Sequence, residues 1–403
     1  MRDRVLIFGG AFCRATAAGT LKVFLGFYLI AIGLTHGELG VVVSAGLAGV
    51  MLGTLTASFL GDRIGRRKSL ILLLLINLGG MAGLYFLSDF ASILIIGFLG
   101  MVNGMGKERG AAVALETAAL PQTAPEQNRT KVFAWYNALI DIGQSVGSLL
   151  GGLPVVLRHR GMGMLESYRV MILVYCGLVI LALLCVVLLT RKVELGEGVR
   201  RSKLSPESRK IVTGFAALSW LDSFGSGFIA GSIFSLWLSL RFGVAEDAVS
   251  LLFFCGNIAN AISHFGAAWI SRRIGLVNTM VFTHIPSNVF LMSLALAPDF
   301  AWAIGLYLAR ELLVEMDVPT RQSYLVGVVK PEERTAASGL VSVARNLGWA
   351  CAPTLAGWTM SLFKGIATVS PAPVIIAGGL KIVYDLALWR SFRNVKPPEE
   401  RKA

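Results

Sequence analysis

Long apolar stretches recur along almost the whole chain, and they constrain its fold more than any other feature. A helix that crosses a bilayer needs roughly 20 mostly apolar residues, and about twelve stretches meet that rule. They lie near residues 5–34, 39–61, 69–87, 92–115, 131–155, 169–190, 211–240, 247–270, 277–297, 301–326, 335–361 and 373–390. Only 15% of the 403 residues are charged, where a soluble chain has about a quarter. The sequence therefore predicts an all-α membrane protein with twelve transmembrane helices.

One connection differs from the others, which are mostly short. Residues 191–210, RKVELGEGVRRSKLSPESRK, are polar and strongly basic and contain Gly and Pro. This segment divides the predicted spans into six and six. We therefore predict a six-helix bundle at residues 1–190, a cytoplasmic linker at 191–210, and a second six-helix bundle with a short cytoplasmic tail at 211–403.

The basic residues are concentrated on one side of the predicted membrane. If the N-terminus is cytoplasmic, the segments on that side hold roughly 24 Lys and Arg, against about four in the opposite connections. This bias predicts a multi-pass protein of the cytoplasmic (inner) membrane with both termini in the cytoplasm. It also accounts for much of the net charge of +13, so no nucleic-acid partner is expected.

The two halves share short sequence identities in the same order. FLGDRIGRRKSL at 59–70 aligns with WISRRIGLVNTM at 269–280, and PEQNRT at 125–130 aligns with PEERT at 331–335. GQSVGSLLGG at 143–152 aligns with GWACAPTLAG at 348–357. Parallel repeats of six helices are one of the standard plans of transporters, with the substrate site near the bilayer midplane. We therefore expect two pseudo-symmetric halves around a central site.

The basic run after the second span carries a motif beyond its charge. It resembles the signature of the major facilitator superfamily, and the resemblance extends over essentially the whole chain. The matching residues are Asp62, Arg63, Gly65, Arg66, Arg67 and Leu70, with Ser58 in place of the opening Gly. Basic residues alone would keep this loop in the cytoplasm, but Asp62 and Gly65 are not needed for that. The resemblance implies a conformational latch between the halves, in which Asp62 meets a helix N-terminus.

A glycine pattern in span five resembles a motif of the family's antiporters. Gly143, Gly147, Gly151 and Gly152 match it, with Ser148 where the motif has Pro. Ordinary packing of small residues between helices is the alternative interpretation. The resemblance implies a member of the drug/proton antiporter type, although the family's Arg-x-x-x-Gly signature is not found in span four.

Two charged residues are predicted at similar depth in the two halves. Aligning FCRATAAG with WLDSFGSG places Arg14 of span one and Asp222 of span seven at equivalent positions. Charged residues inside a span usually face a cavity or a partner. We expect both to face one central cavity, either as a structural ion pair or as groups that handle substrate or protons. Asp222 is the first candidate for a protonatable group.

Span ten carries several charges near a proline. On a helical wheel Arg310, Asp317 and Arg321 fall within about 40° of one another. Asp317 and Arg321 are also spaced i, i+4, which favours a local ion pair. Pro319 between them predicts a kink that would suit a gate. Arg310 lies deeper, where we expect it to meet substrate.

Span four contains three successive charged residues, Lys107, Glu108 and Arg109, which point in three directions around a helix. Arg109 is equivalent to Arg321 in the repeat, which favours an inward direction for both. We therefore count Glu108 and Arg109 among the candidates for substrate or proton handling.

The remaining intramembrane polar residues rank lower. Lys22, Asp141 and Arg345 are secondary candidates, and His264 is interpreted as a packing residue. In span twelve Lys381 and Asp385 are spaced i, i+4, so we expect them to neutralise each other in a structural role.

Enzyme and nucleotide-binding functions have little support. GMVNGMGKE lacks the first Gly and the Ser or Thr of a phosphate-binding loop. We expect no cofactor and no metal, and a transport cycle that uses a gradient. The prediction is a monomeric secondary active transporter that moves a small molecule by alternating access, with proton-coupled efflux as the leading hypothesis. The alternatives are proton-coupled or exchange transport of a small organic anion or nutrient, and a non-transporting membrane sensor.

Overall fold

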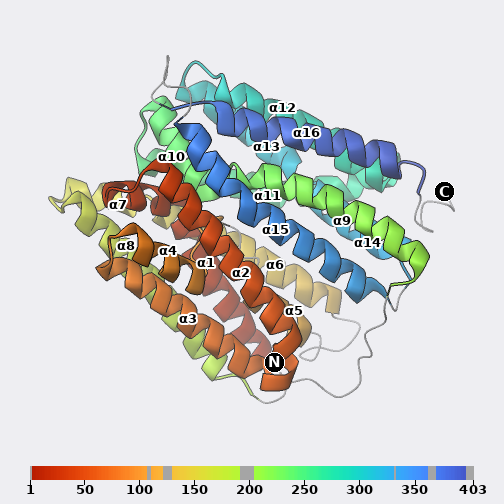
Figure 1. The fold of residues 1–403 in the computed structure, drawn as a ribbon, viewed down its shortest axis with the longest axis horizontal. Helices are drawn as coiled ribbons and strands as arrows, with labels where there is room; N and C mark the ends of the chain where they lie inside the picture. Colours follow the sequence, from red (N-terminus) through yellow and green to blue (C-terminus); the bar gives the residue numbers. More distant parts are fainter. Residues whose placement is uncertain are drawn as a thin grey trace. The chain divides into compact units, whose positions relative to one another are not determined.

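Helices form the regular structure of the chain in the computed structural model, which describes residues 2–106, 110–120, 129–190, 204–330, 333–361 and 369–395 (Figure 1). No strand occurs within these ranges, so the prediction of an all-α chain is confirmed. The helices are α1 (Arg2–Ala31), α2 (His36–Ile64), α3 (Arg66–Phe86), α4 (Phe90–Leu99), α5 (Ala111–Ala119), α6 (Arg129–Leu150), α7 (Leu153–His159), α8 (Met164–Val187), α9 (Pro206–Gly227), α10 (Gly231–Phe242), α11 (Glu246–Ile274), α12 (Leu276–Ala295), α13 (Phe300–Val314), α14 (Asp317–Val328), α15 (Arg334–Met360) and α16 (Ala372–Phe392).

Each of the predicted spans contains one or two of these helices. Within the described ranges, 7 helical stretches are long and apolar enough to cross a membrane, and α4 is a shorter apolar helix. Spans four, seven and ten are each divided into two helices: α4 and α5, α9 and α10, and α13 and α14. The apolar stretches therefore locate the spans, but they do not reveal these interruptions.

The chain folds into two compact units. Unit 1 comprises Met1–Glu197, Ala230–Phe254 and Pro353–Val369, and unit 2 comprises Gly198–Ile229, Cys255–Ala352 and Ser370–Ala403. Unit 1 thus contains α10, the start of α11 and the end of α15 in addition to the helices of the first half. These contact-based units are a different division from the two halves of the sequence repeat, whose boundaries remain a prediction. Residues 191–203 of the predicted linker lie outside the described part of the chain.

Small residues bring α1 and α6 together in unit 1. A Cβ atom at Gly143 would lie 2.8 Å from the carbonyl oxygen of Phe12, and one at Gly147 would overlap the carbonyl oxygen of Thr16. Gly19 of α1 faces the backbone of α6 in the same way. Backbones approach this closely only where side chains are absent or small. The glycine pattern of span five is therefore a packing surface for α1.

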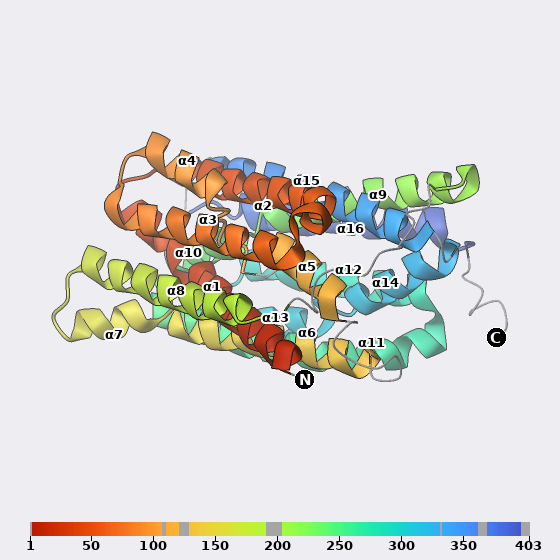
Figure 2. The same ribbon diagram turned by 90° about the horizontal axis from the view of Figure 1, so that it is seen from below.

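The other two glycines of the pattern, Gly151 and Gly152, lie between α6 and α7. A Cβ atom at Gly151 would meet Val23 of α1, and one at Gly152 would lie 3.0 Å from the Cα atom of Asp247. The helix that resumes as α7 lies beside α8 in the same unit (Figure 2). The pattern thus combines close packing with a helix end.

Second-half segments bond to first-half helices within unit 1. The Ser235 hydroxyl of α10 donates to the carbonyl oxygen of Val23 at 3.0 Å. At the start of α11 the buried carboxylate of Glu246 accepts hydrogen bonds from the Arg158 guanidinium and the Tyr168 hydroxyl. These polar contacts, and not only apolar packing, hold α10 and the start of α11 in this unit.

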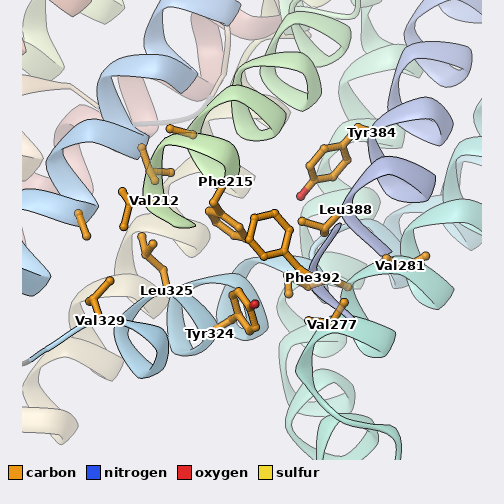
Figure 3. Packing of buried hydrophobic residues seen from close by; sticks show 14 residues of the cluster. Val212, Phe215, Val277, Val281, Tyr324, Leu325, Val329, Tyr384, Leu388 and Phe392 are labelled. Atoms are coloured by element: carbon orange, nitrogen blue, oxygen red, sulfur yellow. The ribbon is translucent and has the colours of Figure 1, made fainter. Parts of the chain in front are cut away.

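Aromatic side chains form the centre of the apolar core of unit 2 (Figure 3). Phe215 of α9 stacks on Tyr324 of α14 with ring centroids 5.7 Å apart, and Phe392 of α16 meets both rings edge-on. Aliphatic residues of these three helices and of α12 and α15 complete the cluster. Helices α12 and α16 also lie along each other (Figure 1). This core holds together the helices that carry the charged groups described below.

Two backbone landmarks repeat between the halves. Gly65 before α3 and Gly275 before α12 have φ angles of 102° and 85°, in the region that favours glycine. Asp89 and Asp299 are the N-caps of α4 and α13, and each carboxylate accepts a backbone N–H three residues on. The repeat inferred from short identities is therefore also a repeat of local conformation.

The residues of the predicted latch are described in part. Gly65 makes the turn between α2 and α3, Arg66 is buried, and the Arg67 guanidinium donates to the carbonyl oxygen of Val187 at the end of α8. The side chains of Asp62 and Arg63 lie outside the described part of the structure. The latch itself stays a prediction.

The start of α9 is tied to the segment before α15. The backbone N–H of Ser205, the N-cap of α9, donates to Glu333 at 2.8 Å. Hydrogen bonds from the Ser208 hydroxyl and from this N–H lower the pKa of Glu333, which lies outside the predicted spans. An ionised Glu333 near the first turn of α9 is also favoured by the helix dipole.

The packing of α6 on α1 predicts the effect of adding one methyl group. Gly147→Ala should lower the free energy of unfolding by about 1–3 kcal/mol, because the new Cβ atom overlaps the Thr16 carbonyl oxygen. Gly177→Ala on α8 is the matched control, since nothing lies within 4 Å of a Cβ atom there. Denaturant unfolding in detergent measures both. Equal stability of the two variants would contradict the packing assignment.

Candidate functional site

The carboxylate of Asp222 lies at the centre of a buried charge network in unit 2. Asp222 is on α9 and is 2% exposed. Its oxygens lie 2.7 Å from Lys381 Nζ of α16, 3.1 Å from Arg345 Nη1 of α15 and 3.3 Å from Arg321 Nη1 of α14. One acid therefore connects four helices.

Glycines on two helices allow the cations to reach Asp222. A Cβ atom at Gly348 would lie 2.5 Å from the carbonyl oxygen of Trp220, so α15 approaches the backbone of α9 closely, one turn from Arg345. On α9 a Cβ atom at Gly225 would lie 3.1 Å from Cγ of Lys381. The missing side chain leaves room for the lysine stem. Gly348 and Gly225 thus leave the space that Arg345 and Lys381 need to approach Asp222.

Asp317 contributes a second acid to the same network. Its carboxylate lies 2.9 Å from Arg321 Nη1, which confirms the local ion pair predicted from the i, i+4 spacing. Span ten is interrupted at Glu315–Met316, and Pro319 lies in the first turn of α14. Proline is tolerated there because the first turn has no intrahelical acceptor for its missing N–H. The interruption predicted near Pro319 is therefore found a few residues before it.

The predicted pairing of Lys381 with Asp385 is wrong. Lys381 donates to Asp222, and Asp385 instead lies 2.8 Å from Nδ1 of His284 on α12. Asn288, one turn along α12, donates to the other oxygen of Asp385 at 3.3 Å. Contacts with α9 and α12 replace the pair within α16, so both residues join the Asp222 network.

A histidine extends the network beyond the fixed charges. Nε2 of His284 lies 3.5 Å from Nζ of Lys381, so contacts run from Asp222 through Lys381 and His284 to Asp385. Among the described residues of unit 2, three acids balance three cations in this group: Asp222, Asp317 and Asp385 with Arg321, Arg345 and Lys381. Buried charges are tolerated only when they are paired in this way.

Unit 1 contains a smaller charged group around Arg14. Both terminal nitrogens of its guanidinium lie 2.7 Å from the Glu116 carboxylate of α5, a bidentate geometry. The Tyr136 hydroxyl of α6 donates to the same carboxylate at 2.7 Å. The structure thus pairs Arg14 with Glu116 and Asp222 with cations of its own unit, in place of the ion pair considered between Arg14 and Asp222.

Arg14 and Asp222, which the sequence repeat aligns, carry opposite charges and are each paired within their own unit. The Glu116 carboxylate of α5 pairs with Arg14, and cations of α14, α15 and α16 surround Asp222. The alignment did not predict these partners, because Glu116 lies seven residues after Arg109, the residue aligned with Arg321.

Arg310 lies in a third polar cluster, on α13. Its guanidinium donates to the neighbouring Glu311, whose other oxygen accepts from the Asn260 amide of α11 at 2.6 Å. Arg310 and Glu311 are buried, and Asn260 is half-buried. Arg310 thus sits among polar groups, although on a helix separate from Asp317 and Arg321.

Several predicted residues lie outside the described part of the chain, among them Lys107, Glu108 and Arg109; the same holds for the side chain of His264. Of the residues described, no group of three or more His, Cys, Asp or Glu is arranged to hold a metal ion.

Sequence reasoning missed Glu116, His284 and Asn288. Each is a polar residue in an otherwise apolar stretch, and Asn288 follows His284 by one helical turn. That isolation in a span was a usable signal, because unpaired polar groups are costly in lipid. Their partners, in contrast, come from distant helices.

A family model described as the Major Facilitator Superfamily matches residues 7–312 and 215–403. An uncharacterised membrane protein of Saccharomyces cerevisiae is 24% identical over 433 residues, covering 98% of this chain and 95% of that protein. A gallate transporter of Pseudomonas putida is 32% identical over 132 residues, covering 32% of this chain and 27% of that protein. The crystal structure of a D-xylose–proton symporter is similar in fold, with a TM-score of 0.73, 14% identity and 96% coverage of both chains.

The network predicts a large cost for neutralising Asp222. Asp222→Asn should lower the free energy of unfolding by about 3–5 kcal/mol, because Lys381 and Arg345 keep buried charges without their carboxylate. Adding Lys381→Met should recover about 1–3 kcal/mol, measured as a double-mutant cycle in detergent. The exposed Asp247→Asn is the control. Additive effects of the two substitutions would rule out direct pairing.

The group around Arg14 gives a separate prediction. Tyr136→Phe removes one hydrogen bond to the Glu116 carboxylate and should cost about 1.5–3 kcal/mol. Glu116→Gln should cost more, about 3–5 kcal/mol, because it leaves Arg14 buried without a counter-charge. Thermal unfolding of both variants checks this order, and the reverse order would contradict it.

Proposed function

The chain belongs to the major facilitator superfamily, and on this premise we propose that it is a secondary active transporter that exports a small molecule in exchange for protons. Transport proceeds by alternating access, and the ion gradient supplies the free energy. The protein acts as a monomer in the cytoplasmic membrane, with both termini in the cytoplasm. The excess of Lys and Arg on one side supports this orientation.

The observation that carries the proposal is the Asp222 network. A charged group within a span is a functional-site hypothesis by default, because burying it is expensive. Asp222 contacts cations from three helices, so a change in the charge balance of this group alters helix contacts directly. A ligand or proton shifts a conformational equilibrium only through interactions that differ between the states. A charge network shared among helices meets that condition.

The glycine pattern supports antiport as the direction. Gly143 and Gly147 pack α6 against α1 at backbone distance, as a sealed helix interface requires. In the family's antiporters this motif lies in the same span. The latch formed by Asp62, Arg63, Gly65, Arg66 and Arg67 and a gate at Asp317 and Pro319 are further parts of the proposal. The buried Arg66 and the interruption before Asp317 support them.

A small organic anion is the second candidate substrate. The similarity of 132 residues to a gallate transporter favours it, since gallate is a carboxylate. Four arginines within the spans are the cations that would serve such a substrate: Arg14, Arg109, Arg310 and Arg321. In this case protons move in the same direction as the substrate, or a second anion is exchanged.

Substrate identification is the first step of the test. Strains that overexpress or lack the protein are grown on a panel of toxic compounds and limiting nutrients, with gallate among the nutrients. Resistance on overexpression supports export, and a nutrient defect in the deleted strain supports uptake. The compound that responds then serves as the probe in proteoliposomes.

The transport experiment distinguishes the candidates. We expect an inward proton gradient to accelerate export in the wild type and to have little effect on Asp222→Asn, with the exposed Asp247→Asn as the charge-matched control. Faster uptake under the same gradient would instead support anion symport. Absence of flux for every compound would support a membrane sensor, and flux that ignores the gradient would refute proton coupling.

A further inference from the structure

His284 lies between an acid and a lysine at the end of the Asp222 network. Its Nδ1 is 2.8 Å from Asp385 Oδ1, and its Nε2 is 3.5 Å from Lys381 Nζ. His284 is 1% exposed and Asp385 is fully buried. Asn288 donates to the second oxygen of Asp385 at 3.3 Å, which fixes the carboxylate against the ring.

These contacts define which nitrogen of His284 carries hydrogen. An ionised carboxylate only accepts hydrogen bonds and an ammonium only donates them. Nδ1 must therefore donate to Asp385, and Nε2 must accept from Lys381. A neutral imidazole has one donor and one acceptor nitrogen and fits both contacts. The lone pair of Nε2, which accepts from Lys381, is thus the basic position of the imidazole.

We propose that Nε2 of His284 is the proton-binding atom of the transport cycle, with Asp385 as the counter-charge of the imidazolium. This inference rests on the proposed function of proton-coupled transport. Proton binding at Nε2 forms one N–H bond and breaks only the hydrogen bond from Lys381. It converts the contact with Asp385 into an ion pair and the contact with Lys381 into repulsion between two cations. Lys381, which also holds Asp222, passes the change from α12 to α9.

Asp222 is less suited to carry the proton because of its partners. Neutralising it would leave Lys381 and Arg345 buried without their shared carboxylate. Arginine keeps its charge in proteins, so Arg345 and Arg321 act as fixed charges beside Asp222. Histidine, in contrast, changes its charge near physiological pH. Asp222 therefore anchors the cations, and His284 is the group whose charge changes.

The surroundings of His284 contribute charged or titratable groups from several helices. On α16, besides Lys381 and Asp385, the ring of Tyr384 lies perpendicular to the imidazole with centroids 6.0 Å apart. Asp222 of α9 reaches His284 through Lys381, and Arg321 of α14 and Arg345 of α15 contact Asp222. The imidazolium would thus contact one carboxylate and one ammonium directly. A conformational change that alters either distance would change the affinity of His284 for the proton.

Proton binding is tested without any substrate. The full chain, labelled with isotope-enriched histidine in lipid nanodiscs, is titrated over about pH 5 to 9 and its imidazole signals are followed by NMR. His284→Gln identifies the signal, and His159→Gln, at an exposed site, is the matched control among the four histidines. We expect the His284 signal to titrate reversibly at Nε2. A signal that stays in one protonation state throughout would overturn the proposal.

Asp385→Asn tests the counter-charge and guards against misfolding of the glutamine variant. Without the carboxylate, the pH at which half of the His284 imidazole is protonated should fall by about one unit or more. An unchanged value would contradict the role of Asp385. Because Asn is nearly isosteric with Asp, this variant retains the volume of the site.

A transport measurement separates this inference from the proposed function. With the probe from the growth screen, His284→Gln should lose about tenfold in gradient-driven export. Substrate exchange without net proton movement should continue, which shows that the variant is folded. If the wild type ignores the proton gradient, the proposed function fails whatever the titration shows. If the wild type is coupled and His284→Gln is equally coupled, only the role of His284 fails.

Discussion

The packing of unit 2 depends on the ion pairs between Asp222 and three cations. A carboxylate within a membrane span is tolerated only with compensating charge, and here α14, α15 and α16 each supply a cation. Gly348 and Gly225 bring α15 and α16 close to α9 next to these ion pairs. The same close packing therefore also places the cations within reach of Asp222. Since each cation belongs to a different helix, none of these helices can move away from α9 without exposing a charge. Any second conformation must therefore offer the cations other partners of similar strength.

The charged groups of the two units differ in what they can change. In unit 1 the bidentate contact of Arg14 with Glu116 is completed by the Tyr136 hydroxyl, and the arginine keeps its charge. That arrangement suits a constant contact between α1, α5 and α6. In unit 2 the imidazole of His284 lies between Lys381 and Asp385, beside acids and cations that balance. Only a network with such a group can alter its own charge balance while its fixed charges remain paired.

The sequence predicts much of the fold and part of the site, for reasons that particular residues make clear. The length of the apolar stretches locates the spans. The short identities around Gly65 and Gly275 indicate a sequence repeat, and both glycines have positive φ angles. The Asp317–Arg321 pair follows from helical spacing alone. The same spacing failed for Lys381 and Asp385, because helices far away in sequence offer each a partner. Partner choice depends on packing between distant helices, which the spacing along one helix does not reveal.

The opposite charges of Arg14 and Asp222 make the two halves different in chemistry although they repeat in sequence. Both retain the same backbone landmarks, the glycines before α3 and α12 and the aspartate caps of α4 and α13. A chain assembled from two copies of the first half would have two Arg14–Glu116 pairs and no histidine between charges. One assembled from two copies of the second half would have the Asp222 network twice and lack the arginine pair. The two halves thus share a backbone plan but differ in their charged groups. The Arg14–Glu116 pair of the first half keeps its charges, whereas the second half contains His284, whose charge can change.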